Sequence, residues 1–211
     1  MIDKKRWQET WQRLGARVTP QTVFEELVDA YSSLDRFYHN LTHIEDCLSI
    51  FDQTKSLAVH PEEVELAIWF HDSVYDTRRN DNEQRSAEWA KAVIIQTGVR
   101  SVIAERVSYS ILATHHNTEI TDTDSQLMAD ADLSMLGREP VVFWQYEENI
   151  RKEYSWVSES LFREKRIKVL QGFLDRQHIY YHQMYRNRFE EKARVNIEQA
   201  ILKLRDIRNS I

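Results

Sequence analysis

Residues that break helices are scarce in this chain. Its 211 residues include only four glycines and three prolines. All-β folds need such residues at frequent turns, so their scarcity argues against a β-sandwich or β-barrel. The single cysteine, Cys47, excludes an internal disulfide and fits a reducing compartment. We expect Cys47 to be a small buried residue of a helix.

Long apolar runs and an excess of positive charge are also missing. No stretch of about 18 apolar residues is present that could span a membrane, and no apolar segment follows the basic residues 4–6 as in a signal peptide. The formal net charge of −6 argues against a nucleic-acid polymer as partner. We therefore expect a cytoplasmic protein that binds neither a membrane nor a nucleic-acid polymer, with a homo-oligomer left open.

Helix-forming residues dominate the composition instead. Glu, Lys, Arg, Gln, Leu and Ala are frequent, and 42% of the residues are hydrophobic, as in a chain with a packed core. The composition predicts an all-α fold, and the length fits a single domain over residues 1–211. Apolar periodicity predicts helices at about residues 3–15, 20–31, 40–51, 61–72, 82–97, 101–114, 125–135, 139–158, 159–175 and 180–208.

Capping residues indicate where several of these helices begin and end. Asn40 is a suitable N-cap, Pro61 suits the first turn of a helix, and Gly98 suits the position just after a helix end. Residues 64–70 are nearly all apolar, which predicts a central helix rather than a peripheral one. The alternating charges of the last helix predict a position on the surface.

The central helix ends in two residues that bind metals, His71 and Asp72. Burying an unpaired charge costs several kcal/mol, or the pKa shifts until the group is neutral. A divalent cation would compensate such a pair. His43 upstream and either Asp130 or Asp132 downstream are its candidate partners.

Two imidazoles and two carboxylates form the expected ligand set. This mixture suits one divalent ion such as Mn²⁺, Fe²⁺, Co²⁺, Ni²⁺ or Mg²⁺, with positions left open for water and substrate. It does not suit structural zinc, which favours thiolates. A metal with open positions polarises a phosphoryl oxygen and generates hydroxide near neutral pH, so the set indicates a hydrolytic site.

Four segments, in this order, resemble the H…HD…D signature of HD-domain metal-dependent phosphohydrolases, in particular a bacterial branch described as predicted HD-superfamily hydrolases. They are residues 36–43 (RFYHNLTH), 71–76 (HDSVYD), 82–87 (NEQRSA) and 130–137 (DADLSMLG). The resemblance covers about residues 20–140, with the helices of 141–211 packed on this core. It implies a helical bundle with a metal site in its core. It also implies hydrolysis of a phosphomonoester or phosphodiester, often a nucleotide, by metal-activated water.

Carried over onto this sequence, the resemblance implies the metal ligands His43, His71, Asp72 and Asp132, with Asp72 also catalytic. Asp132 is the Asp of the Ala-Asp-Leu triplet in the last motif. Asp130 lies about 200° around a helix from Asp132, so both cannot easily bind the same ion.

Further residues near these motifs have two interpretations each. Arg36, His39 and Asn40 are candidate substrate-binding residues, with Arg36 or His39 reaching a phosphate because arginine offers a bidentate fork, or they form only a cap and turn. Asp76 lies on the loop after the His-Asp pair, where it would contact substrate or bond a ligand histidine from behind. Glu83 is a general acid–base beside the metal water or a first-turn acid that suits the helix dipole.

Two adjacent histidines, His115 and His116, follow the sixth predicted helix. We expect them to bind the substrate phosphate or to orient a water, and a second metal at this position is the alternative. That alternative would make the protein a di-iron oxygenase of HD type. A third hypothesis is a module that binds a nucleotide without catalysis. The sequence does not name the substrate.

Overall fold

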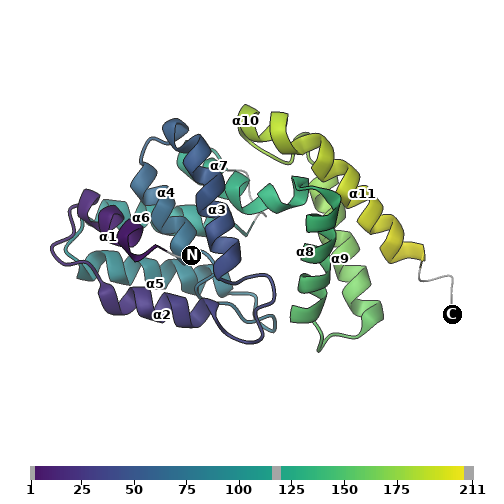
Figure 1. The fold of residues 1–211 in the computed structure, drawn as a ribbon, viewed down its shortest axis with the longest axis horizontal. Helices are drawn as coiled ribbons and strands as arrows, with labels where there is room; N and C mark the ends of the chain where they lie inside the picture. The colour runs from purple at the N-terminus through teal and green to yellow at the C-terminus, as the bar shows by residue number, and fades with distance from the viewer. Residues whose placement is uncertain (1–2, 116–119, 207–211) are drawn as a thin grey trace. The chain divides into compact units, whose positions relative to one another are not determined.

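The computed structural model describes residues 3–115 and 120–206, and every regular element in these ranges is a helix (Figure 1). The all-α prediction is therefore confirmed. Within the same ranges, no helix has both the length and the apolar character that crossing a membrane requires. The elements are α1 (Lys4–Arg13), α2 (Gln21–Tyr31), α3 (Leu41–Thr54), η1 (Lys55–Leu57), α4 (Pro61–Phe70), α5 (Asn82–Gln96), α6 (Ser101–Ala113), α7 (Thr123–Asp132), η2 (Leu133–Gly137), α8 (Pro140–Glu153), α9 (Glu159–Leu174), α10 (Gln183–Tyr185), η3 (Arg186–Glu190) and α11 (Glu191–Asp206).

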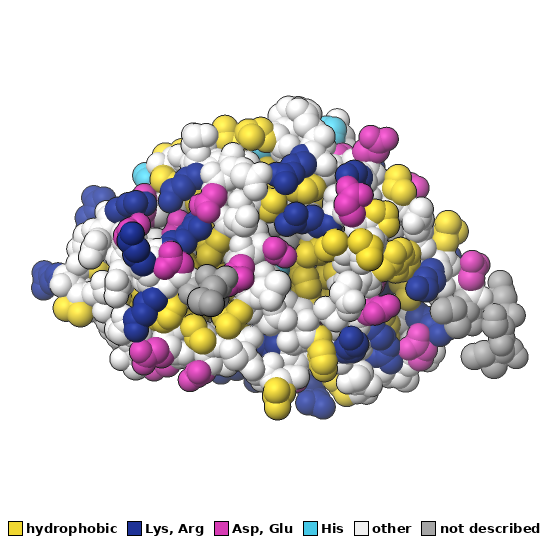
Figure 2. All heavy atoms as spheres, in the orientation of Figure 1, with side chains coloured by type: hydrophobic (Ala, Val, Ile, Leu, Met, Phe, Trp, Pro, Cys, Tyr) yellow, Lys and Arg dark blue, Asp and Glu magenta, His cyan; other side chains and the backbone are white. Residues whose placement is uncertain are grey.

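The chain divides into two compact units, Met1–Asp132 and Leu133–Ile211. The first unit contains helices α1 to α7, and the second contains η2 and the helices after it. A single domain over residues 1–211 stays a prediction. On the face drawn in Figure 2, basic and acidic side chains are intermixed and form no continuous patch of one sign.

Helix α4 is the centre of the first unit. It packs against α1, α3, α5, α6 and α7, and all its residues from 63 to 70 are buried. A helix that is apolar nearly all round has no face to offer to water, so neighbours must cover every side. The prediction of a central helix is confirmed, and its C-terminal end carries the candidate metal-binding residues.

The predicted helix ends at Asn40, Pro61 and Gly98 are confirmed. The Asn40 side chain accepts a hydrogen bond from the Thr42 backbone N–H at 2.9 Å and begins α3. Pro61 is the first residue of α4. Gly98 follows α5 with a φ of 80°, a left-handed conformation that glycine adopts without steric cost.

The C-terminal helix differs from its prediction in two ways. Glu190 accepts hydrogen bonds from the backbone N–H groups of Ile179 and Tyr180 at 3.0 and 3.3 Å, which holds this stretch as a loop. The helix therefore starts only at α10, and the π-helical turn η3 precedes α11. The expected surface position holds for one face only, because α11 buries the other through the residues Ala193, Asn196, Ile197, Ala200 and Ile201.

Candidate metal centre

Three helices of the first unit bring the predicted ligands together. His43 lies in the first turn of α3, and His71 directly follows the last residue of α4. Asp132 is the last residue of α7. Each side chain is therefore close to a helix end, where a small set of caps and turns fixes its position.

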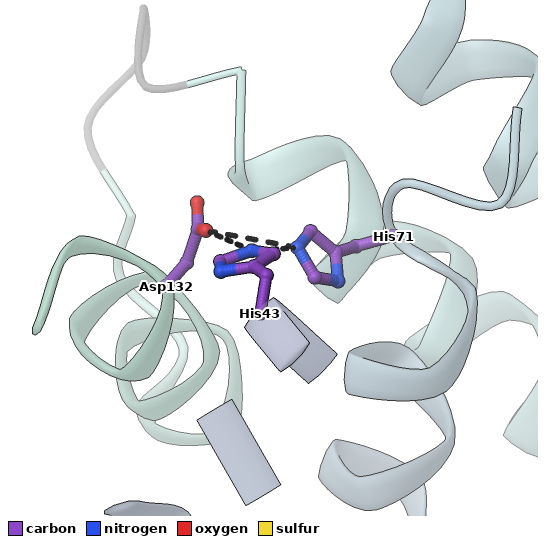
Figure 3. Close-up of side chains that lie close together, drawn as sticks. All are labelled: His43, His71 and Asp132. Carbon is purple, nitrogen blue, oxygen red and sulfur yellow. Dashed lines mark hydrogen bonds and ion pairs between the residues drawn. The ribbon is translucent and has the colours of Figure 1, made fainter. Parts of the chain in front are cut away.

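The donor atoms of these residues converge (Figure 3). His43 Nε2 lies 3.1 Å from His71 Nε2. Asp132 Oδ1 lies 3.2 Å from His43 Nε2 and 3.6 Å from His71 Nε2. Among the described residues, His43, His71 and Asp132 form a group whose donor atoms all lie within 4.8 Å of one another, and this group could hold a metal ion.

Asp72 adds a second carboxylate beside both imidazoles. Its Oδ2 lies 3.0 Å from His71 Nε2 and 3.5 Å from His43 Nε2. The two imidazole side chains are only 1 to 2% exposed, whereas the carboxylates of Asp72 and Asp132 are 15% and 18% exposed. The cluster therefore reaches solvent through its carboxylates, on the side from which water and a substrate would approach.

The tautomer of His71 suits metal binding. Its Nδ1 lies 2.9 Å from the carbonyl oxygen of Ile68. Because a carbonyl oxygen can only accept, Nδ1 carries the proton, and in the neutral ring Nε2 presents its lone pair to the cluster. A backbone carbonyl behind the ring is the usual partner of a histidine that binds a metal through its other nitrogen.

The charges of the cluster favour a cation at its centre. Burial lowers the pKa of His71, but the carboxylates of Asp72 and Asp132 outweigh burial and hold that pKa well above its ordinary value. Burial raises the pKa of Asp72, but the imidazoles of His71, His39 and His43 outweigh it and hold that pKa below its usual range. Both directions come from the attraction between imidazole and carboxylate charges at a buried site.

The separations between the donor atoms also fit a divalent ion. An octahedral ion with bonds of about 2.1 Å places neighbouring ligand atoms about 3.0 Å apart. The measured nitrogen–nitrogen and nitrogen–oxygen distances of the cluster run from 3.0 to 3.6 Å. Imidazole nitrogen and carboxylate oxygen are both ligands of Mn²⁺, Fe²⁺, Co²⁺ and Ni²⁺. The residues present therefore fit the group that the sequence predicted.

Asp132, rather than Asp130, supplies the distal carboxylate of this group. Asp130 is fully buried two residues earlier in α7. This placement agrees with the choice that the motif resemblance implies, and the angle between the two positions on a helix disfavours a shared ion. The assignment of Asp132 as a metal ligand stays a prediction.

Arg36, predicted to reach a phosphate, is directed at the backbone. Its Nη1 donates to the carbonyl oxygens of His39 and Asp72 at 3.2 and 2.6 Å, and its Nη2 donates to that of Ser73 at 3.0 Å. The Asn40 side chain donates to the Phe37 carbonyl in addition to capping α3. Substrate contact by Arg36 and Asn40 stays a prediction, while the turn that they form is observed.

His39 lies beside the cluster. Its ring stacks on Tyr75 with centroids 4.1 Å apart, and its centroid is 6.0 Å from that of His43. The charge of His39 also lowers the pKa of Asp72. The structure thus places His39 beside both His43 and a carboxylate of the cluster.

Asp76 and Glu83 lie after the cluster in the chain. Asp76 Oδ1 accepts a hydrogen bond from the Arg78 backbone N–H at 2.9 Å and so forms a local turn. Glu83 is in the first turn of α5, the position that the dipole interpretation predicts. Their roles in substrate binding and catalysis stay predictions.

The two histidines after α6, His115 and His116, were predicted to bind the substrate phosphate or to orient a water. His115 is exposed in the turn that follows α6. His116 lies outside the described residues. A second metal, and contact of either histidine with a phosphate, therefore stay predictions.

Sequence reasoning missed two tyrosines that support the site. The Tyr31 hydroxyl donates to the carbonyl oxygen of Trp69 at 3.0 Å, and the Tyr75 ring stacks on His39. A buried tyrosine hydroxyl needs an acceptor, and that requirement was the available signal.

Fold and site together define an all-helical protein with a buried histidine–carboxylate cluster that could hold a divalent ion. Comparisons of the chain with protein-family models, with curated proteins and with solved structures found no match. The resemblance to HD-domain phosphohydrolases therefore depends on the sequence motifs themselves.

Proposed function

We propose that this protein is a metal-dependent phosphohydrolase of HD type that acts on a small phosphate ester. The observation that supports this proposal is the convergence of His43, His71 and Asp132, with Asp72 beside both imidazoles. A nucleotide as the substrate follows from the motif resemblance alone. The proposed ion is a single divalent one, of the kind that binds nitrogen and oxygen donors together.

A divalent ion supplies this site with a Lewis acid for a phosphoryl oxygen and lowers the pKa of a water molecule. His43 and His71 would hold the ion through Nε2, since Nδ1 of His71 is engaged with the Ile68 carbonyl. Asp72 and Asp132 would balance its charge from the more exposed side. Asp72 would also orient the attacking water and take its proton, as a carboxylate within hydrogen-bond reach can.

His39 is the residue that we assign to the substrate phosphate. Its ring is held by stacking on Tyr75, and it lies next to the ligand His43. A phosphate oxygen bound by a protonated imidazole would gain a charge-assisted hydrogen bond. Glu83 remains the candidate acid for the leaving group, on its position in the sequence.

The first experiment combines elemental analysis with a phosphate-ester screen on protein purified without chelator or metal-binding tag. Wild type should contain about one equivalent of a divalent metal, as a mononuclear site requires. His71→Ala and Asp72→Ala should lose both metal and turnover while keeping their helical circular dichroism. The exposed His178 offers a matched control, because His178→Ala removes an imidazole far from these motifs in sequence.

Each alternative outcome has a distinct meaning. Full turnover in a metal-free Asp72→Ala variant would refute the proposed mechanism. Two equivalents of iron with oxygen-dependent turnover would support the oxygenase. A rise in melting temperature with a nucleotide, without any product, would support a binding module.

A further inference from the structure

Helix α4 presents His71 and Asp72 at its C-terminal end, where backbone carbonyls lack partners within the helix. The last four carbonyl groups of any α-helix have no intrahelical donor, and these groups also carry the negative end of the helix dipole. The last turn of α4, residues 67–70, carries no basic side chain that could oppose this negative end. The carbonyl oxygens of Ile68 and Phe70 are engaged by His71 Nδ1 and the Ser73 backbone N–H. Carbonyls of this region also accept from side chains of an earlier segment of the chain.

The segment before α3 supplies those side chains. The Tyr31 hydroxyl donates to the carbonyl oxygen of Trp69 at 3.0 Å. Arg36 donates from Nη1 to that of Asp72 at 2.6 Å and from Nη2 to that of Ser73 at 3.0 Å. The planar guanidinium of Arg36 thus bridges the carbonyls of two successive residues, Asp72 and Ser73. Asp72 belongs to the cluster.

The Arg36 side chain is itself held in place. It is 9% exposed, and its guanidinium carbon lies 5.1 Å from the centre of the Tyr31 ring and 5.6 Å from that of Tyr75. Its Nη1 also donates to the carbonyl oxygen of His39. The Arg36 guanidinium is preorganised, because it lies between two aromatic rings and its N–H groups are already hydrogen-bonded. The backbone carbonyls that accept these hydrogen bonds are held in place as a result.

We propose that Arg36 is a positioning residue that sets the metal affinity of the cluster. By bridging the carbonyls of Asp72 and Ser73, it fixes the backbone from which the Asp72 carboxylate projects, and its charge opposes the negative end of α4. This inference depends on the metal centre of the proposed function but not on phosphate-ester hydrolysis. It gives Arg36 a role different from the phosphate contact that the sequence suggested.

A second arginine that contacts α4 provides the control. Arg106 binds α4 at its opposite end, where its Nε donates to the Glu63 carboxylate at 2.7 Å. Arg106→Met therefore removes an arginine of α6 that binds α4 and leaves the buried Glu63 carboxylate behind, but the contacts that the cluster makes with Arg36 stay unchanged. It should destabilise the fold without weakening the metal site.

The experiment titrates metal-free wild type, Arg36→Met and Arg106→Met with Co²⁺ and records the visible absorption of the bound ion, with circular dichroism as the test of folding. Arg36→Met should bind Co²⁺ about 10- to 100-fold more weakly, with an altered spectrum, as is typical when groups that orient metal ligands are removed. Arg106→Met should keep the wild-type affinity and spectrum. If Arg36→Met does not fold, Arg36→Lys takes its place, since lysine keeps the charge and loses the fork.

Wild-type affinity and spectrum in the folded Arg36 variant would overturn the inference. An equal loss in Arg106→Met would also overturn it, because general destabilisation would then explain the effect. Wild type that binds no divalent ion would refute the metal centre and this inference together. Wild type that binds Co²⁺ but hydrolyses no phosphate ester would refute the proposed function alone.

Discussion

Replacement of Arg6 by methionine should destabilise the protein strongly at neutral pH. Glu65 lies in the middle of α4 with its side chain only 2% exposed, and it accepts hydrogen bonds from Arg6 Nε and Nη2, both at 2.9 Å. Thr10 Oγ1 and Lys55 Nζ contact the same carboxylate at 2.5 and 3.1 Å. In Arg6→Met the buried Glu65 carboxylate therefore loses Arg6 and keeps the contacts with Thr10 and Lys55.

The magnitude follows from these contacts. Removing one partner of a buried ion pair costs about 3–5 kcal/mol when the other charge is left uncompensated. Arg6 is partly exposed and Lys55 remains, so we expect about 3 kcal/mol, toward the lower end of that range. Arg6→Met combined with Glu65→Leu should recover most of the loss, because an apolar pair of similar volume is often neutral or stabilising.

The loss should also depend on pH. Burial raises the pKa of Glu65, but the hydrogen bonds from Arg6 and Thr10 outweigh burial and hold that pKa below its ordinary value. A carboxylate whose folded pKa is depressed stabilises the fold above its unfolded pKa of about 4.3, and this stabilisation is lost as the pH falls through the folded pKa. The unfolded state is common to both proteins, so the difference between wild type and Arg6→Met should be large at neutral pH and shrink as the pH falls toward the lowered folded pKa of Glu65 in wild type, because a protonated Glu65 no longer needs Arg6.

Urea denaturation followed by tryptophan fluorescence measures this loss, with EDTA present so that bound metal does not contribute. Lys55→Met is the matched control, since Lys55 makes one ion pair with Glu65 from a more exposed position and should cost about 1 kcal/mol or less. A loss of less than about 1 kcal/mol in Arg6→Met, or no recovery in the double variant, would show that Glu65 does not depend on Arg6.

Two further predictions concern the metal centre. A divalent ion at 100 times its dissociation constant should raise the free energy of unfolding of wild type by about 2.7 kcal/mol, as urea denaturation would measure. The same ion should leave the free energy of unfolding of His71→Ala unchanged. An equal rise in both proteins would show that the ion binds at another site. Asp132→Asn should weaken Co²⁺ binding in a titration, because Asp132 Oδ1 lies 3.2 Å from His43 Nε2 in the group that could hold a metal ion. Asp130→Asn should bind Co²⁺ as wild type does, and a loss in Asp130→Asn alone would make Asp130 the ligand instead.

Features set by neighbouring residues could be predicted from the sequence. The apolar run of α4, the Asn40 cap and Gly98 each depend on local chemistry, and each was predicted. The convergence of His43 and His71 with a distal carboxylate was also predicted, because a buried His-Asp pair needs compensation, and the motif resemblance implied Asp132 as that carboxylate. The π-helical turn η3 was not predicted, because it accompanies contacts between Glu190 and a preceding loop.

Features set by distant partners could not be predicted. The Arg36 guanidinium donates to the carbonyls of Asp72 and Ser73, which lie 36 and 37 positions later in the chain. Nothing near Arg36 in the sequence identifies those acceptors. Glu65 is a charged residue within an apolar run, and its partner Arg6 lies 59 positions earlier. Such contacts follow from how the helices pack, and packing is decided by the whole core rather than by one segment.

The order of the donors along the chain has a consequence for biosynthesis. His43, His71, Asp72 and Asp132 all precede Leu133, the first residue of the second compact unit. Translation at about 5–20 residues per second completes the donor set seconds before the rest of the chain exists. All residues of the proposed metal centre are thus synthesised before any residue of the second unit.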